Sequence, residues 1–117
     1  MKMSAPKRDY PDLHDHIEAL EKAGLLITVE DPVDKDAEMH ALVRWQFVGG
    51  LKESERKAFL FKNVVNAKGR KYDLPIVVGA LAANQDIYSV GMGAPVDQIG
   101  AKWDEAIANP VDPVIVE

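Results

Sequence analysis

The chain has 117 residues, of which 47% are hydrophobic and 28% charged, with a formal net charge of −5 at pH 7. This length predicts one domain with one core and leaves no room for a second. The negative charge argues against a general binder of nucleic acid, and the absence of cysteine excludes disulfides, thiolate nucleophiles and cysteine-ligated metal sites.

The N-terminal residues 1–11 predict a basic, flexible tail. They contain lysine and arginine, but polar residues follow instead of an apolar run. Nowhere do roughly eighteen apolar residues occur together, as a membrane-spanning helix would need. We therefore expect a chain that neither carries a signal peptide nor crosses a membrane, and we expect it in the cytoplasm.

The first helix is expected from an N-cap at Asp12 to about Lys22 or Ala23, before a terminating glycine. Its apolar residues recur at helical spacing and are Leu13, Ile17 and Leu20. Residues 25–30 follow as a β-branched, partly alternating strand, which Pro32 stops.

A second helix is predicted next, with Asp34 or Asp36 as its cap and the Gly49-Gly50 pair at its end. Its apolar stripe is formed by Met39, Leu42, Val43 and Phe47. Residues 51–57 offer almost no apolar face, so they predict a solvated loop, with a helical turn as the alternative.

Two short apolar runs, residues 58–61 and 74–79, predict buried strands. Each is too short and too rich in aromatic or β-branched residues to form a helix. Residues 63–73 connect them and contain a Lys-Gly turn signal. This connection is polar and long for a tight hairpin, so we expect an excursion between paired strands.

The C-terminal part predicts two helices and an extended tail. Asn84 or Asp86 caps a short helix that Gly91 and Gly93 close, with Ile87 and Val90 on one face. A longer helix has Pro95 in its first turn and ends at Asn109-Pro110. Its apolar face comprises Val96, Ile99, Gly100, Trp103 and Ile107.

The order of these elements predicts an α+β fold, with a small mixed or antiparallel sheet covered by three to four helices. Residues 12–110 would form a single domain. Residues 111–117 are extended by proline and apolar where chain ends are usually polar, so we expect a linker toward a further domain.

Histidines are the first candidates for a metal site, and the chain has three: His14, His16 and His40. Two residues apart on one helix, His14 and His16 point about 160–200° from each other. His40 lies on another helix, so the histidines could share a metal only if the tertiary structure brought them together. A structural or surface role is therefore favoured for all three. We predict no metal ligand.

Gly91-Met-Gly93 is the candidate phosphate-binding loop. Val96 stands where the dinucleotide fingerprint has its third glycine, and the pair follows a helix instead of a strand. A turn is therefore the favoured interpretation.

Lys68, Arg70 and Lys71 form a small basic cluster in the central connection. Such a cluster can contact a phosphate or an acidic partner. Three charges around a glycine turn are common at a solvated loop tip, and we favour that interpretation.

Two pairs of carboxylates could supply an acid and a base: Glu18 with Glu21, and Asp36 with Glu38. Nothing in the sequence raises a pKa or places a partner beside them. Solvated helix faces explain them better, and no catalytic residue is predicted.

The two tryptophans could stack on an aromatic ligand. Trp103 lies on the apolar stripe of its helix, which predicts a core position. Trp45 is off the stripe of its own helix and is the better candidate for an interface.

Several phrases come in the order and spacing of the N-terminal domain of UbiD-type carboxy-lyases, which the chain resembles over nearly all of residues 12–117. Each of these segments alone is only a helix cap or a strand. Together with the helix of residues 84–93, however, they follow the order and spacing of the family. They are Asp12-Leu-x-x-x-Ile17-x-x-Leu-Glu-Lys-Ala-Gly24-x-Leu, Val33-Asp34-x-x-x-Glu38, Ala58-Phe-Leu-Phe-Lys-Asn-Val64 and Pro75-Ile-Val-Val-Gly79.

The resemblance implies a decarboxylase, often reversible, that acts on aromatic, heteroaromatic or α,β-unsaturated carboxylic acids. It also implies prenylated FMN, Mn²⁺ and K⁺, with the modified flavin as the electron sink. In the family, the split β-barrel that binds the flavin and the catalytic arginine and glutamates follow the part seen here. No catalytic, cofactor-binding or metal-binding residue can therefore be assigned to this chain.

Two hypotheses follow. In the favoured one, the chain is the N-terminal domain of a UbiD-like enzyme that is homo-oligomeric when full length, and it packs beside the flavin-binding domain and helps to shape the substrate entrance. In the other, it is a free-standing interaction module or the small subunit of a multi-chain carboxylase. A domain taken from a larger enzyme should expose an apolar patch near its C-terminal segment.

Overall fold

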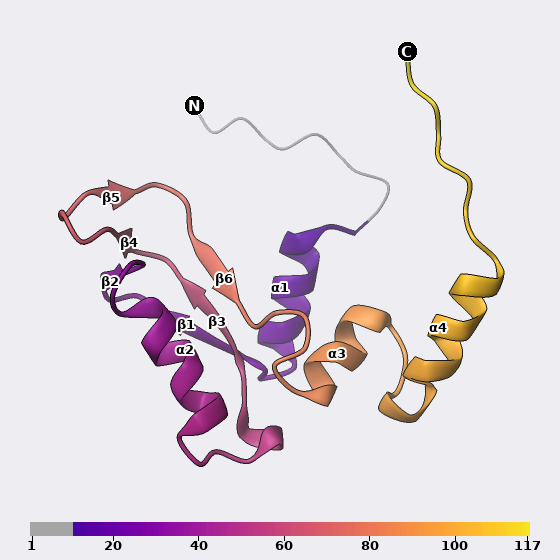
Figure 1. Ribbon diagram of the computed structural model, residues 1–117, viewed down its shortest axis with the longest axis horizontal. Helices are drawn as coiled ribbons and strands as arrows, with labels where there is room; N and C mark the ends of the chain where they lie inside the picture. Colours follow the sequence, from indigo (N-terminus) through magenta and orange to yellow (C-terminus); the bar gives the residue numbers. More distant parts are fainter. Residues whose placement is uncertain (1–10) are drawn as a thin grey trace.

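The computed structural model describes residues 11–117, so nearly all of the predicted basic tail lies outside the described residues. Four α-helices are present in this range (Figure 1): α1 (Leu13–Lys22), α2 (Met39–Val48), α3 (Gln85–Met92) and α4 (Ile99–Ala108). Two 3₁₀ turns, η1 (Glu53–Glu55) and η2 (Val96–Gln98), lie in the connections. The strands are β1 (Leu26–Val29), β2 (Val33–Asp34), β3 (Ala58–Phe61), β4 (Val64–Val65), β5 (Lys71–Tyr72) and β6 (Ile76–Val78).

The strands form two three-stranded mixed sheets, with orders β1-β3-β6 and β2-β4-β5. In the first, β3 pairs in parallel with β1, Leu26 opposite Ala58, and antiparallel with β6, Phe59 opposite Val78. In the second, β4 pairs in parallel with β2 and antiparallel with β5. The predicted α+β class with a mixed sheet is confirmed.

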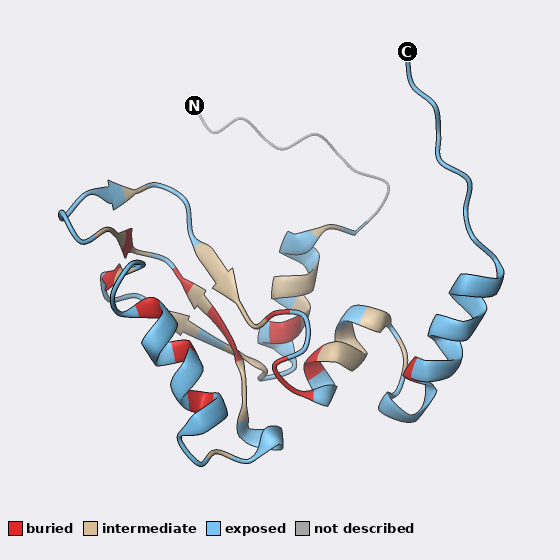
Figure 2. Ribbon diagram, viewed as in Figure 1, coloured by how far each residue is buried: buried red, intermediate tan, exposed pale blue. Residues whose placement is uncertain are grey.

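The core consists of two clusters that lie on opposite faces of the first sheet. Along β3, Ala58 belongs to one cluster, whereas Phe59 and Phe61 belong to the other. Alternate residues of a strand point to opposite faces. Leu20 of α1 and Ile87 of α3 pack with Ala58 in the first cluster. In the second cluster, Met39 and Val43 of α2 pack with the two phenylalanines. The central strand β3 is accordingly buried from both sides, as Figure 2 shows.

The first helix agrees with its prediction. The Asp12 side chain accepts the N–H groups of His14 and Asp15, and the Asp15 carboxylate accepts the N–H of Asp12 at 2.7 Å. This capping box satisfies donors that the first turn leaves unpaired. After Lys22 the chain turns at Gly24, whose φ of +72° favours glycine, and enters β1.

The predicted cap of the second helix is wrong. Helix α2 begins at Met39, behind Glu38, without a side-chain cap. The Asp34 carboxylate accepts the N–H of Asp36 at 2.7 Å and of Ala37 at 3.3 Å. Asp34 therefore ends the short strand β2 and holds the turn that precedes the helix, a local alternative to capping that Asp side chains readily adopt.

The predicted stripe of α2 is only half right. Met39 and Val43 are buried, but Leu42 and Phe47 are partly exposed, and Gln46 takes the third buried position. The Gln46 amide donates to the carbonyl of Lys57 at 3.0 Å and accepts the N–H of Lys57 at 2.9 Å. A buried polar side chain is tolerated here because both of its amide atoms are hydrogen-bonded.

Two connections contain more structure than expected. Residues 51–57 were predicted as a loop and form the turn η1, from which Glu53 accepts the N–H of Gln85 at 2.6 Å. Residues 63–73 contain β4 and β5, so the excursion is a hairpin that builds a second, unpredicted sheet. Each strand has only two residues, too few to leave a periodic signal.

Helix α3 was predicted correctly, with Ile87 buried and Val90 packed beside it, whereas α4 begins only at Ile99, because the residues after Pro95 form the separate turn η2. Asn84 is the N-cap of α3, since its side chain accepts the N–H of Ile87 at 2.8 Å. The face of α4, however, is buried only at Ile99, while Trp103 is 47% and Ile107 73% exposed. The core position expected for Trp103 is wrong, because α4 packs mainly against α3 and η2 and extends away from the sheets (Figure 1).

The core assignment predicts a clear difference between two leucines of α1. Leu20 is fully buried and Leu13 is 52% exposed. Leu20→Ala should lower the free energy of unfolding by about 2–5 kcal/mol because it leaves a cavity between α1 and the sheet. Leu13→Ala, the matched control, should cost less than about 1 kcal/mol. Urea unfolding followed by circular dichroism measures both, and equal losses would contradict the assignment.

Candidate functional site

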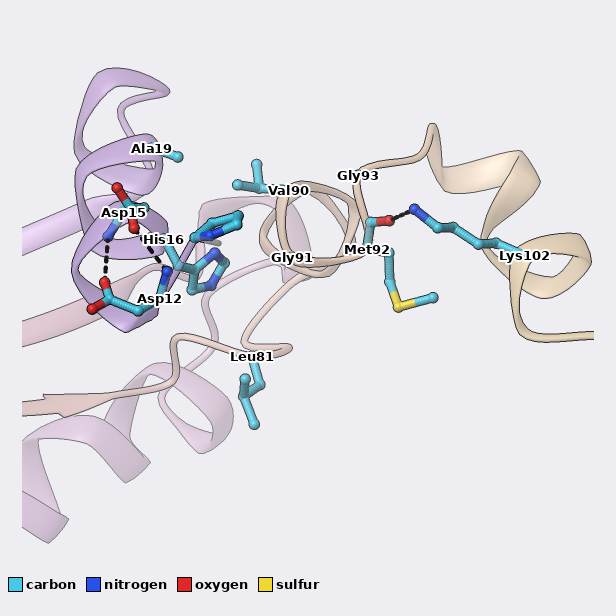
Figure 3. A pocket seen from close by; sticks show the side chains of 11 residues that line it. Asp12, Asp15, His16, Ala19, Leu81, Val90, Gly91, Met92, Gly93 and Lys102 are labelled. Carbon is cyan, nitrogen blue, oxygen red and sulfur yellow. Dashed lines mark hydrogen bonds between the residues drawn. The ribbon is translucent and has the colours of Figure 1, made fainter. Parts of the chain in front are cut away.

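A cleft of about 670 Å³ lies between α1, α3 and the start of α4. Asp12, Asp15, His16 and Lys102 provide its charged and polar groups (Figure 3). The His16 Nε2 lies 2.6 Å from the carbonyl of Ala80, so this nitrogen carries the proton. His16 therefore ties α1 to the segment between β6 and α3.

The other polar groups of this cleft are also engaged in holding the fold. Lys102 of α4 donates to the carbonyl of Met92 at the end of α3. The carboxylates of Asp12 and Asp15 form the capping box of α1. These contacts stabilise the ends of α1 and α3.

The three histidines do not meet. His14 Nδ1 lies 3.3 Å from the Asp12 carboxylate, His16 contacts Ala80, and His40 borders a small cleft on α2. Among residues 11–117, no three His, Cys, Asp or Glu side chains are placed to hold a metal ion. The candidate phosphate loop is the end of α3, where Gly93 has a φ of +62° and forms the C-cap.

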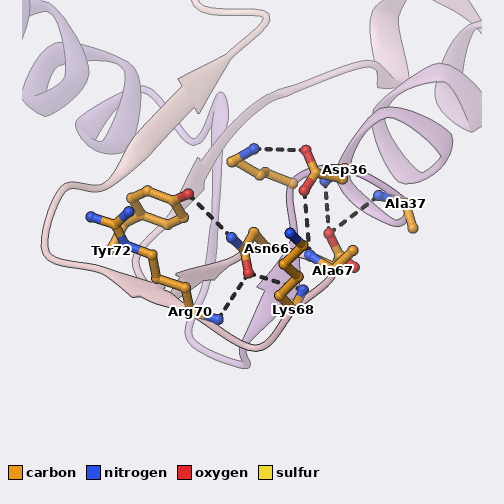
Figure 4. Close-up of polar contacts among 9 residues, drawn as sticks. Asp36, Ala37, Asn66, Ala67, Lys68, Arg70 and Tyr72 are labelled. Carbon is orange, nitrogen blue, oxygen red and sulfur yellow. Dashed lines mark hydrogen bonds and ion pairs between the residues drawn. The ribbon is translucent and has the colours of Figure 1, made fainter.

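The basic cluster lies on the β4–β5 hairpin, whose turn is organised by polar side chains (Figure 4). The Asn66 carbonyl oxygen accepts the N–H of Lys68 at 3.0 Å and of Arg70 at 2.8 Å. The Arg70 guanidinium lies 5.1 Å from the centre of the Tyr72 ring. The cluster thus lies at the tip of a hairpin whose turn the Asn66 side chain holds.

Two of the four candidate carboxylates, Glu18 and Asp36, form ion pairs with neighbouring lysines. Glu18 lies 2.8 Å from Lys22, and this hydrogen bond lowers the pKa of the exposed Glu18 carboxyl. A hydrogen bond from Lys35 and another from the N–H of Ala67 lower the pKa of Asp36 below its ordinary value. Lowered pKa values keep these groups ionised, which suits surface pairs and not general acids.

Two apolar surfaces are exposed. One is the predicted apolar face of α4, with Trp103 and Ile107, beside the C-terminal segment where the sequence led us to expect an apolar patch. The other is a cleft of about 610 Å³ at the edge of the first sheet, lined by Leu13, Phe47 and residues 77–83. The uncharged run of residues 74–83 was the available signal for the second surface. Trp45 is exposed on α2, consistent with its expected surface position.

Within residues 11–117, none of the helices has the length and apolar character needed to cross a membrane. A comparison with protein families gave one result that bears on function. The family described as the 3-octaprenyl-4-hydroxybenzoate carboxy-lyase N-terminal domain matches residues 17–107. The matched region begins inside α1 and ends inside α4, so it includes both sheets.

The contacts of Asp36 predict a pH-dependent contribution to stability. Its pKa is lowered from 3.8 in the folded state, so the stabilisation is complete above that value and is lost as the pH falls through the folded pKa. Asp36→Asn should therefore show a smaller loss of stability below pH 3.8 than the parent chain. Urea midpoints across the acid range measure this, with Glu38→Gln as control, and parallel curves for Asp36→Asn and the parent would refute it.

Proposed function

The chain belongs to the family of UbiD-type carboxy-lyase N-terminal domains, and from this premise we propose that it serves as the N-terminal domain of a decarboxylase. The proposed substrates are aromatic, heteroaromatic or α,β-unsaturated carboxylic acids, with prenylated FMN, Mn²⁺ and K⁺ as cofactors. The reaction would be reversible. The absence of cysteine supports a cytoplasmic location for this enzyme.

The described residues do not fit these cofactors. A divalent metal prefers several carboxylate or imidazole ligands, and residues 11–117 bring no three such side chains together. Among the residues that the structure describes, Lys102 is the one lysine or arginine that lines the cleft between α1 and α3, and it already donates to the carbonyl of Met92. We therefore propose that a flavin-binding domain outside this chain holds the cofactors and the substrate.

The proposed role of this domain is to pack against that flavin-binding domain through α4. The observation that carries it is the exposed apolar face of α4, with Trp103 and Ile107. Residues 111–117 follow directly, and Val111, Val114, Ile115 and Val116 are all exposed. Large exposed apolar patches mark interaction sites, so this surface fits a domain interface reached through an extended linker.

The direct test uses the protein as its natural source makes it. Its intact mass should exceed 12.9 kDa, the mass of the present chain. With prenylated FMN and Mn²⁺ it should release carbon dioxide from members of a panel of aromatic and unsaturated acids. A natural mass of 12.9 kDa would overturn the proposal in favour of an interaction module or a small carboxylase subunit.

The docking role predicts the effect of one substitution in the natural protein. Ile107→Asp should weaken the contact between α4 and the flavin-binding domain, because it places a carboxylate in an apolar interface. Limited proteolysis should then cut residues 111–117 roughly tenfold faster or more. Val48→Asp is the control, because Val48 is a similarly exposed residue on α2. Equal cleavage rates in both variants would contradict docking through α4.

A further inference from the structure

Helix α4 buries very little apolar surface against the rest of the domain. Of its ten residues, Ile99–Ala108, only Ile99 is buried, and this side chain belongs to neither of the two core clusters. The helix extends away from both sheets (Figure 1). Packing of an apolar face usually supplies most of the stability of a helix in a protein. Helix α4 therefore depends on other contacts to keep its position.

Two side-chain hydrogen bonds join α4 to α3. The indole N–H of Trp103 donates to the hydroxyl of Tyr88. The ammonium group of Lys102 donates to the carbonyl of Met92 (Figure 3). The two donors are neighbours in the sequence, about one turn after the start of α4, and the two acceptors lie one turn apart on α3. Both bonds therefore hold the same part of α4 against the second half of α3.

The bond from Lys102 also completes the end of α3. The last carbonyls of a helix have no partner inside the helix, and Met92 is the last residue of α3. A lysine ammonium at this position also interacts favourably with the negative end of the helix dipole. Within Gln85–Met92, the last turn has no basic residue of its own. Lys102 therefore supplies from α4 the positive charge that the end of α3 lacks.

The connection between the two helices is attached to α3 only in its first part. Gly93 closes α3, and the hydroxyl of Ser89 in α3 donates to the carbonyl of Ala94. The N–H of Ala94 in turn donates to the carbonyl of Ser89 at 3.3 Å. Pro95 and the turn η2 follow before α4 begins. A change in the angle between α3 and α4 therefore has to occur within residues 95–98.

We propose that α4 is a hinged arm, and that the hydrogen bonds from Trp103 and Lys102 are the latch that holds it. When the latch is closed, α4 lies against α3. When it opens, α4 detaches as one unit about residues 95–98 while both sheets stay folded. Residues 110–117 follow α4, so the latch sets the direction in which they leave the domain. The inference concerns the attachment of α4 to α3 and does not depend on what contacts the outer face of α4.

Amide hydrogen exchange of the natural protein, followed by mass spectrometry, measures this opening, because a detached helix as short as α4 is marginal in water. Tyr88→Phe removes the acceptor of Trp103, and Lys102→Met removes the other donor. Trp103 is 47% exposed, so its released N–H can bond to water. Each variant should speed exchange of residues 103–108 roughly threefold to tenfold, as expected for one lost hydrogen bond, and leave residues 58–61 of β3 unchanged.

The double variant separates one shared opening from two local ones. If both bonds break in the same opening, their free energies add, and exchange should accelerate by about the product of the two single factors. Tyr72→Phe and Lys68→Met are the matched controls, because both residues lie on the β4–β5 hairpin, and residues 103–108 should then exchange at the parent rate. The same factors are expected when Ile107→Asp is also present, because the opening breaks the latch whether or not α4 contacts another domain.

Three results would overturn the proposal. The first is exchange of residues 103–108 at the parent rate in either single variant, which would show that the lost bond does not hold α4. The second is equal acceleration in residues 58–61, which would show that α4 opens only when the core unfolds. The third is a double variant no faster than the faster single variant, which would show that the two bonds do not break in one opening.

Discussion

The burial of β3 on both faces is the constraint on which the remaining structure depends. A strand with Phe59 and Phe61 on one side and Ala58 on the other is stable only when each face is covered. Helices α1 and α3 cover one face and α2 covers the other. The parallel partner β1 and the antiparallel partner β6 then satisfy its backbone. Elements that do not touch β3, above all α4, remain peripheral.

Local signals in the sequence identified most of the fold. The capping residues Asp12 and Asn84 mark real helix starts, because a cap is decided by the residues within one turn. The burial of Gln46 was not foreseen, because it depends on hydrogen bonds to Lys57, which lies outside α2. The exposure of Trp103 was missed for a similar reason: periodicity identifies an apolar face but does not say what covers it.

Several candidate groups, among them Glu18, Asp36 and His16, form contacts within the fold, such as the ion pair of Glu18 with Lys22. That the chain holds no catalytic, cofactor-binding or metal-binding residue stays a prediction. The cleft at β6 combines Leu13, Phe47 and residues 77–83, which only folding brings together. No spacing rule connects such distant positions. The family, by contrast, was recognisable because several short phrases occur in a fixed order, and its match extends over residues 17–107.

The double hydrogen bond of Gln46 has a consequence for chemical ageing. Conversion of its amide to a carboxylate by deamidation would replace the donor to the Lys57 carbonyl with a second acceptor. The buried carbonyl would then face an oxygen, and α2 would keep only one of its two hydrogen bonds to Lys57, the one that its side chain accepts from the Lys57 N–H. Water reaches this amide only when α2 opens locally, because Gln46 is 3% exposed. Because hydrolysis of the amide is slow compared with closing of the helix, its lifetime follows the fraction of time that α2 spends detached, and a deamidated molecule would detach more easily.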